Sequence, residues 1–393
     1  MKVALVHDYI KEYGGAERVL EALVELYPDA PIYTAFYNKD SLAYQKFKER
    51  TIHPSWVHYI PFFSTYLHSP LRFLAPLIWS SFDFSSYDVV ISSASWYVTK
   101  GFGKKKAKPI EVCYCHTPPR WLYGYKTSIE FQKYWPVRIY AAIVGHFMRM
   151  YDFSSAQKVH YFIANSKETE SRIQKFYRRD ATVVYPPVSL PLESTLPAGR
   201  QGIMNPPAIA FAKRWRAGHE SSKKKDYFFV LARIVGGKGL DLAVETASKM
   251  GFPLKIAGVP AGYYTEHEKL QKIAKDNVEF LGYVSDEQLV KLYSEAKAFL
   301  ALATDEDFGI TPVESMLCGT PVIAYHGGGY KETVIEGETG IFFDTVAVGS
   351  LALAINKFNT VKWDKKVIQK HAEQFSKERF QKEIKEFVEK VTQ

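Results

Sequence analysis

The feature that most constrains the fold of this chain is an alternation of short apolar runs with amphipathic stretches, which occurs in both halves. Apolar runs of strand length separated by helical patterns are typical of βαβ units, in which helices join parallel strands. The first series predicts strands at residues 3–6, 89–92, 111–115, 162–164 and 182–185, with helices at 17–26 and 168–176. The second predicts strands at residues 228–231, 254–257, 278–281, 298–302, 321–324 and 341–343. The expected fold class is α/β, with two Rossmann-like domains built on parallel sheets.

The two series are separated by a segment that breaks the pattern. Two prolines, Pro186 and Pro187, end the first series, and the residues that follow carry Pro and Gly without a period. We therefore predict an N-terminal domain (1–188), a linker or insertion (189–225), a C-terminal domain (226–364) and a helical segment (365–393). The last segment is expected to pack back on the N-terminal domain. Ligands of such folds bind beyond the carboxyl ends of the strands, so we expect a cleft between the domains to hold the site.

Charge and cysteine content narrow the class of protein. The formal net charge of +9 favours anionic partners, namely nucleotide phosphates or an acidic membrane surface. Nucleic acid is disfavoured because no zinc-finger spacing and no RNP-like aromatic motif occurs. Three cysteines without framework spacing suit a reducing compartment. No apolar run reaches the ~20 residues of a membrane span, so we expect a cytoplasmic protein or one bound peripherally to the inner face of a membrane.

Two short motifs follow predicted strands of the first half. The motif GGAER, which begins with Gly14 and Gly15, combines two glycines with a helix N-terminus and so suits phosphate oxygens. An ordinary tight turn explains it equally well. In the motif CHTPPR, His116 would project into the cleft and form a hydrogen bond with a sugar hydroxyl. The alternative is a histidine whose ring is satisfied at a turn.

Two cations follow the first strand of the second half. Arg233 and Lys238 flank a Gly-Gly turn at a predicted helix start, in the sequence LARIVGGKGLD. A guanidinium fork and a compact ammonium at such a position suit a diphosphate and can stabilise it as it departs. Solvated surface cations are the competing interpretation.

The most specific motif is EDFGITPVE, in which Glu306 and Glu314 are eight positions apart. A predicted strand precedes it, and Pro312 fits the first turn of a helix. The pair Thr311 and Glu314 also has the spacing of a capping box, which would explain Glu314 by itself. It would not explain the acidic, glycine-containing loop before it or the glycine loop at residues 327–329.

Together these motifs resemble the retaining family-4 glycosyltransferases of the GT-B fold. The resemblance covers nearly the whole chain apart from the insertion, and it is closest to the GDP-mannose-dependent mannosyltransferases of bacterial surface polysaccharide synthesis. It implies transfer of a hexose, with mannose from GDP-mannose as the best expectation, to a glycan or polyprenyl-linked acceptor. The alternatives are a UDP-sugar donor, a nucleotide-sugar epimerase, and a non-catalytic protein that binds sugar nucleotides.

The resemblance also implies a role for each motif. His116, Arg233, Lys238 and Glu306 would act at the reacting centre, with Glu306 on the hydroxyls of the donor sugar. Glu314 would hold the ribose, and Gly14 and Gly15 would contact the diphosphate from the first domain. Further donor contacts are expected from Gly258, Val259, Tyr283 and Val284 beside the base, and from Phe308, Gly309, Ile310 and Thr311 along the sugar and phosphates. Since cations can replace a metal, neither metal nor cofactor is expected.

One more stretch is unusual in composition. Residues 51–82 contain no acidic residue but several aromatic ones, and a cluster of lysines follows nearby. Such a combination favours contact with anionic lipid, whereas aromatic packing inside the domain and a solvated lysine loop are the alternative. The residues concerned are Trp56, Tyr59, Phe62, Phe63, Tyr66, Phe73 and Trp79, with Lys100, Lys104, Lys105, Lys106 and Lys108.

Overall fold

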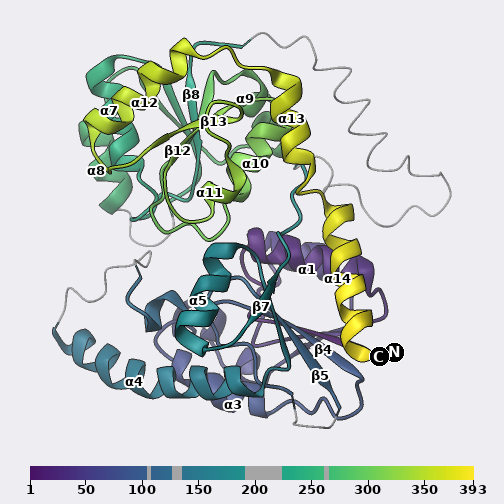
Figure 1. Ribbon diagram of the computed structural model, residues 1–393. Coiled ribbons are helices and arrows are strands. Elements are labelled where there is room, and N and C mark those ends of the chain that lie inside the picture. Colours follow the sequence, from purple (N-terminus) through teal and green to yellow (C-terminus); the bar gives the residue numbers. More distant parts are fainter. Residues whose placement is uncertain (104–107, 126–134, 191–223, 261–264) are drawn as a thin grey trace. The chain divides into compact units, whose positions relative to one another are not determined.

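The computed structural model describes residues 1–103, 108–125, 135–190, 224–260 and 265–393, and the chain divides into two compact units (Figure 1). Unit 1 comprises Met1–Pro187 and Lys377–Gln393, and unit 2 comprises Val188–Ser376. Each unit has its own parallel sheet with helices connecting the strands, which confirms the predicted fold class. Most of the predicted insertion, residues 191–223, lies outside the described residues.

Unit 1 contains a parallel sheet of seven strands in the order β3-β2-β1-β4-β5-β6-β7. The strands are β1 (Val3–His7), β2 (Ile32–Thr34), β3 (Ile52–Pro54), β4 (Val89–Ala94), β5 (Ile110–Cys115), β6 (Tyr161–Ala164) and β7 (Ala181–Val183). The α-helices are α1 (Gly15–Leu26), α2 (Leu42–Phe47), α3 (Ala75–Ser80), α4 (Trp135–Lys158), α5 (Lys167–Tyr177) and α14 (Lys377–Thr392). Short 3-10 or π turns occur at η1 (Trp56–Tyr59), η2 (Phe63–Leu67), η3 (Arg72–Leu74) and η4 (Arg120–Leu122).

Unit 2 contains a parallel sheet of six strands in the order β10-β9-β8-β11-β12-β13. The strands are β8 (Phe228–Leu231), β9 (Leu254–Ala257), β10 (Val278–Gly282), β11 (Ala298–Ala301), β12 (Val322–Tyr325) and β13 (Gly340–Phe343). The helices are α7 (Leu240–Met250), α8 (Thr265–Ile273), α9 (Asp286–Glu295), α10 (Ile310–Leu317), α11 (Tyr330–Thr333), α12 (Val348–Thr360) and α13 (Lys365–Glu373). Of the described helices, none is long and apolar enough to cross a membrane.

In both sheets the strand order reverses direction at one point. The reversal lies between β1 and β4 in unit 1 and between β8 and β11 in unit 2. In doubly wound folds ligands bind outside the carboxyl ends of the strands at such a switch point. The residues that follow these four strands are therefore the first place to look for function.

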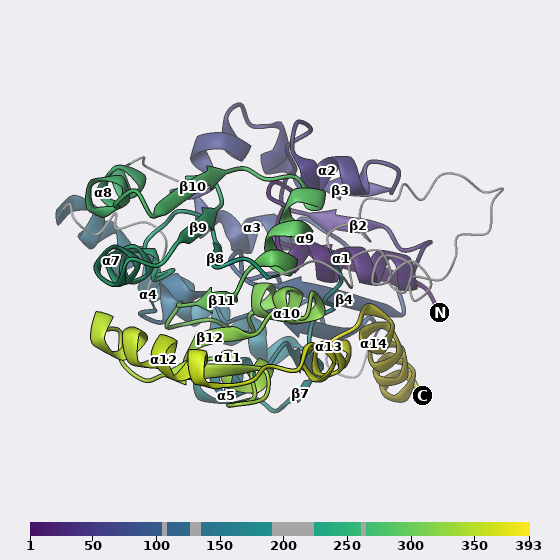
Figure 2. The same cartoon turned by 90° about the horizontal axis from the view of Figure 1, so that it is seen from above.

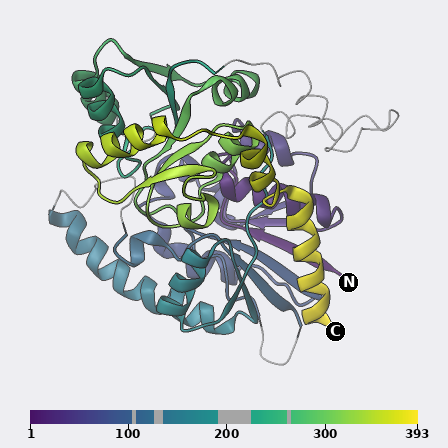
Figure 3. The same cartoon turned by 45° about the horizontal axis from the view of Figure 1, so that its top comes forward.

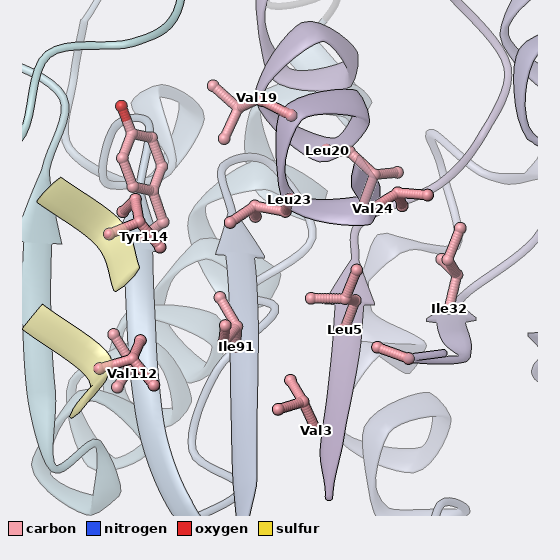
Figure 4. Close-up of a cluster of buried hydrophobic side chains, with 14 of the residues drawn as sticks. Val3, Leu5, Val19, Leu20, Leu23, Val24, Ile32, Ile91, Val112 and Tyr114 are labelled. Atoms are coloured by element: carbon pink, nitrogen blue, oxygen red, sulfur yellow. The ribbon is translucent and has the colours of Figure 1, made fainter. Parts of the chain in front are cut away.

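The core of unit 1 shows why its sequence forms these elements. In α1 the apolar residues Val19, Leu20, Leu23 and Val24 share one face, as helical spacing requires, and they pack over Leu5 and its neighbours in the sheet (Figure 4). The helix α14 completes the same core with side chains spaced four apart, Phe380, Ile384 and Val388. Burial of each stabilises the unit by about 1.5–3 kcal/mol.

The predicted C-terminal segment is divided between the two units. In unit 1, α14 packs on α1, and Gln381 Nε2 donates to the carbonyl of Ala22 at 3.1 Å. In unit 2, α13 lies beside α10 (Figure 2), where Gln369 Nε2 donates to the carbonyl of Leu317 at 3.1 Å. The segment 365–393 therefore does not pack as one piece.

The aromatic stretch at residues 51–82 differs from its prediction in part. Phe63 and Trp79 are buried in a core cluster, whereas Trp56, Tyr59, Phe62, Tyr66 and Phe73 are exposed. Lys100 is not a surface lysine, because it is buried and paired with Asp152. Lys108 pairs with Asp88, and Lys104, Lys105 and Lys106 lie outside the described residues. The prediction of an exposed lysine cluster was thus wrong for Lys100, because its ammonium pairs with the buried carboxylate of Asp152.

Candidate functional site

The switch point of unit 2 holds an ion pair made of two predicted site residues. Lys238 follows β8 and Glu306 follows β11, and these strands are neighbours in the sheet. Lys238 Nζ lies 2.9 Å from Glu306 Oε2, with 30% and 22% of the two side chains exposed. The pair is thus reachable from solvent yet held in place. Arg233, also after β8, is exposed.

Two helices begin beside this ion pair. The N-cap of α7 is Gly239, directly after Lys238, and the N-cap of α10 is Gly309, whose φ of 91° is a conformation that favours glycine. The first turns of α10 include Ile310 and Thr311, which are partly exposed. Helix N-termini carry unpaired N–H groups and a partial positive charge. The switch point of unit 2 is therefore suited to an anion.

The glycine loop after β12 holds the Glu306 loop in position. Gly329 donates its N–H to the carbonyl of Glu306 at 2.9 Å. A Cβ added at Gly328 would lie 2.3 Å from that same carbonyl oxygen, and one added at Gly329 would lie 2.4 Å from the Cα of Phe308. Only glycine permits this approach of two backbones. Phe308 is itself buried and packs edge-on against Phe375.

Glu314 is placed differently from Glu306. It lies within α10, is fully buried, and accepts a hydrogen bond from the Tyr293 hydroxyl at 2.8 Å. The capping-box alternative is wrong, because α10 begins at Ile310 with Gly309 as N-cap, and Thr311 lies inside the first turn. A capping box at Thr311 would require the helix to begin there. The ribose contact assigned to Glu314 stays a prediction.

The residues expected beside a base lie at the ends of β9 and β10. Gly258 donates its N–H to the carbonyl of Gly282 at 2.8 Å, which joins the two loops. Val259 and Tyr283 next to them are 46% and 76% exposed. Val284 is half-buried. An exposed aromatic ring beside an exposed aliphatic side chain can cover the face of a planar base.

The switch point of unit 1 holds a buried polar network. His116 Nε2 lies 2.8 Å from Ser93 Oγ, and Ser93 Oγ lies 3.0 Å from His7 Nδ1. His7 Nε2 then lies 3.4 Å from Glu17 Oε1, and Glu17 Oε2 accepts the N–H of Gly14 at 2.8 Å. His116 is only 9% exposed, so it does not project freely as predicted but is bonded within the unit.

The chemistry of the carboxylate fixes the direction of one of these hydrogen bonds. A carboxylate only accepts, so His7 Nε2 donates to Glu17. The Ser93 hydroxyl bridges the other ring nitrogen of His7 and Nε2 of His116. Burial, and secondarily the charge of His7, lower the pKa of His116 to about 3, which keeps its ring neutral.

Sequence reasoning missed three members of this network, His7, Ser93 and Glu17. His7 ends the first strand and Glu17 is part of the GGAER motif, so both positions were visible in the sequence. What could not be seen is that β1 and β4 are neighbours, which brings His7 to Ser93. Gly14 is the N-cap of α1, and Gly15 begins the helix.

Two doubly wound units, each with polar groups at its switch point, are the architecture found in GT-B glycosyltransferases. The sequence agrees with this class along most of its length. Residues 13–191 match the model for Glycosyltransferase Family 4, and residues 211–379 match that for Glycosyl transferases group 1. The chain is therefore a GT-B glycosyltransferase whose first half is similar to Family 4 and whose second half is similar to group 1.

Individual relatives are similar over shorter stretches. A D-inositol 3-phosphate glycosyltransferase of Mycolicibacterium smegmatis is 34% identical over 134 residues, which is 32% of this chain and 31% of that protein. An alpha-1,3/1,6-mannosyltransferase of Neurospora crassa is 42% identical over 83 residues, or 21% of this chain and 18% of that one. The match thus spans about a third or less of these curated relatives.

Solved structures resemble the chain over its full length. Anabaena HepE in complex with UDP and glucose has a TM-score of 0.67 at 18% identity and covers 99% of both chains. The lipopolysaccharide outer core galactosyltransferase WaaB has a TM-score of 0.65 at 17% identity and covers 100% of both. At this level of identity the likeness establishes the fold.

Proposed function

We propose that the protein transfers a hexose from a nucleoside diphosphate sugar to an acceptor hydroxyl, with retention at the anomeric carbon. The observation that carries the proposal is the Lys238–Glu306 ion pair at the switch point of unit 2. It combines a cation for phosphate with a carboxylate for sugar hydroxyls, beside the N-terminus of α10. The match of the first half to Glycosyltransferase Family 4 and of the second half to Glycosyl transferases group 1 supports the same activity.

The diphosphate would bind where positive charge is concentrated. Lys238 and Arg233 supply full charges, and the N–H groups at the start of α10, from Gly309 to Thr311, supply partial ones. As the bond to the sugar breaks, negative charge grows on the leaving phosphate. These preorganised groups stabilise that charge and account for rate enhancement without a metal ion.

Glu306 would hold the donor sugar through its hydroxyls. Its pairing with Lys238 orients the carboxylate before the donor arrives. On binding, the ammonium can contact a phosphate oxygen while it stays near the carboxylate. The adenine-, guanine- or uracil-type base would then lie against Val259 and Tyr283, both exposed at the end of the sheet.

A front-face displacement fits these residues better than a covalent glycosyl intermediate. A retaining mechanism with an enzyme nucleophile needs a carboxylate close to the anomeric carbon. Glu314 is buried and accepts a hydrogen bond from Tyr293, and Glu306 is paired with Lys238, so neither carboxylate is placed as a nucleophile. We propose that the acceptor oxygen bonds to the anomeric carbon while the bond to the phosphate oxygen breaks. The electron pair leaves with the diphosphate, whose oxygen takes the acceptor's proton.

For the donor we propose GDP-mannose, used in assembly of a cell-surface glycan or glycolipid on the cytoplasmic side of the membrane. The matched relative named as a mannosyltransferase supports mannose. A UDP-sugar is the second candidate, since HepE was solved with UDP and with UDP-glucose. An epimerase or a non-catalytic binding protein would consume no acceptor, so product analysis separates them from the transferase.

The test is a thermal-shift panel of the full chain with GDP, UDP, ADP and their sugar conjugates, with a chelator present. A ligand at ~100 times its dissociation constant adds about 2.7 kcal/mol of stability. We expect GDP and GDP-mannose to raise the melting temperature. A response to UDP and its conjugates alone would mean that the donor is a UDP-sugar, and the proposed transferase activity would stand. Silence with every nucleotide would overturn the proposed donor site.

A further inference from the structure

The exposed apolar side chains of unit 1 are concentrated on two stretches. Of the 24 large hydrophobic residues that are exposed in the described part of the chain, seven lie on α4 and six on residues 56–77, so the distribution is far from even. Single exposed apolar residues need no explanation, whereas a continuous set marks a surface that something covers.

The helix α4 exposes large apolar side chains on its outer face. Its inner face is buried on the unit through Gly145, Met148, Asp152, Ser155 and Ala156. Its outer face carries large side chains at steps of three or four residues, so that they form one stripe. They are Trp135, Ile139, Ile143, Phe147, Met150 and Phe153, of which Phe147 is 62% exposed. In Figures 1 and 3 the helix runs along the margin of unit 1.

The second stretch is joined to α4. The Tyr140 hydroxyl donates to the carbonyl of Pro70, which ties the N-terminal part of α4 to residues 67–71. Both elements also pack on the same core, because Met148 of α4 belongs to the cluster that contains Phe63 and Ile78. Their exposed side chains, which include Tyr59, Phe62, Tyr66 and Leu77 on the second stretch, thus belong to one region of unit 1.

The charged residues near these apolar side chains indicate which kind of partner the surface binds. The helix has a single acidic residue, Asp152, which is buried against Lys100, whereas the basic residues Arg138, Arg149 and Lys158 are exposed. Residues 51–82 contain no acidic residue at all. An apolar stripe whose exposed charged neighbours on α4 are all basic is complementary to anionic lipid headgroups above an acyl layer.

We propose that α4 and residues 56–77 form a docking surface for an anionic phospholipid bilayer, with α4 lying in the plane of the interface. A second copy of the chain is the poorer occupant. In a symmetric pair the same surface contacts itself, so the basic residues of α4 would meet a surface whose α4 and residues 51–82 offer no exposed carboxylate. The inference deepens the proposed function, on which its biological meaning rests, because a lipid-linked acceptor is found at such a surface.

The experiment is flotation of the full chain with vesicles, without donor or acceptor. One set is phosphatidylcholine, and the other contains about a third phosphatidylglycerol. We expect the chain to float with the anionic vesicles, and Phe147→Glu to lower the bound fraction at least tenfold. The matched control is Leu353→Glu on α12 of unit 2, which is 71% exposed and should float like wild type. Equal melting temperatures show that each variant is folded.

Two outcomes would overturn the proposal. One is a Phe147→Glu chain that floats as well as wild type, or a wild type that ignores anionic vesicles. The other is a wild-type dimer in solution that Phe147→Glu dissociates, which would assign the surface to a second copy. Because no nucleotide is used, these results are independent of the proposed activity. Conversely, vesicle binding without nucleotide binding would leave the docking surface standing and the transferase in doubt.

Discussion

The two units have corresponding switch points but fill them with different kinds of polar group. In unit 1 the groups are buried, linked from His116 through Ser93 and His7 to Glu17, and they bond to one another. In unit 2 the Lys238–Glu306 pair is charged and partly exposed. A buried, mutually satisfied network resists a change of charge, whereas a half-exposed ion pair can exchange its partner for a ligand. The comparison therefore favours unit 2 for the proposed binding of an anion and leaves a fixed, neutral histidine in unit 1.

The largest effect that tests this comparison is the response of unit 1 to acid. The folded pKa of His116 is lowered to about 3, below the ordinary 6.5, so the unfolded chain binds the proton more readily. The stabilising effect is present above pH 6.5 and is lost as the pH falls from 6.5 toward 3. At 1.36 kcal/mol per pH unit, lowering the pH from 6.5 to 5 removes about 2 kcal/mol from the free energy of unfolding.

The measurement is urea unfolding at pH 7.5 and 5.0, followed by tryptophan fluorescence. Trp56, Trp79, Trp96, Trp121 and Trp135 all lie in unit 1, so the signal reports mainly on that unit. In His116→Gln the acid loss should shrink by about 2 kcal/mol. Burial also lowers the pKa of His68, to about 4, but His68 is present in both proteins and cancels. Equal acid losses in both would mean that the network accepts a proton.

The next effect concerns unit 2 and is expected in catalysis rather than stability. Lys238→Ala should lower turnover at least tenfold, or about 1.4 kcal/mol of transition-state stabilisation, because it removes a charge from the leaving diphosphate. Its cost in unfolding free energy should stay below about 1 kcal/mol, as is usual for a partly exposed pair. Initial rates of sugar transfer and urea unfolding measure the two quantities.

The control for Lys238→Ala is Lys297→Ala. Lys297 Nζ also lies 2.9 Å from a carboxylate oxygen, that of Asp226. Lys297 comes just before β11, however, whereas Glu306 follows it, so the two residues lie at opposite ends of this strand. We expect wild-type turnover in this variant. Wild-type turnover in both Lys238→Ala and Glu306→Ala would refute the assignment of the ion pair to the site.

The sequence predicted the central strands well because strands such as β1, β4 and β11 are buried along their whole length. Strands such as β8 and β9 read as apolar runs and were found at the predicted residues. By contrast, β2 and β3 have three residues each, too few to form a pattern. The helix α4 was missed for a different reason. Its outer face carries large apolar side chains and its inner face includes Asp152, so the separation into an apolar and a polar side that marks an amphipathic helix is weak in its sequence.

The site was predictable only where its residues lie close together in the chain. The EDFGITPVE motif marks both Glu306 and the start of α10, and chemistry alone suggested a cation nearby. That Lys238 pairs with Glu306 depends on β8 lying beside β11 after a crossover, which spacing does not reveal. The same holds for His7 and Ser93, which are 86 positions apart. The burial of a side chain cannot be seen in the sequence either, and burial is what distinguishes Glu314 from the partly exposed Glu306.

The smallest expected effect is a change of no more than about twofold in the KM for the donor, and it decides what Glu314 does. Its carboxylate is fully buried and bonded to Tyr293, which favours an interior role in fixing α10, whereas family resemblance assigns it the ribose. Tyr293→Phe removes one hydrogen bond to a buried charge and should lower the free energy of unfolding of unit 2 by about 1–3 kcal/mol. If the carboxylate acts only inside the unit, Glu314→Gln should likewise reduce stability and leave the KM for the donor within about twofold. A rise in KM of tenfold or more in Glu314→Gln, with Tyr293→Phe close to wild type, would instead show that the carboxylate reaches the ribose. Unit 2 would then bind its ligand partly through a buried charge, and exposure alone would no longer separate the two switch points.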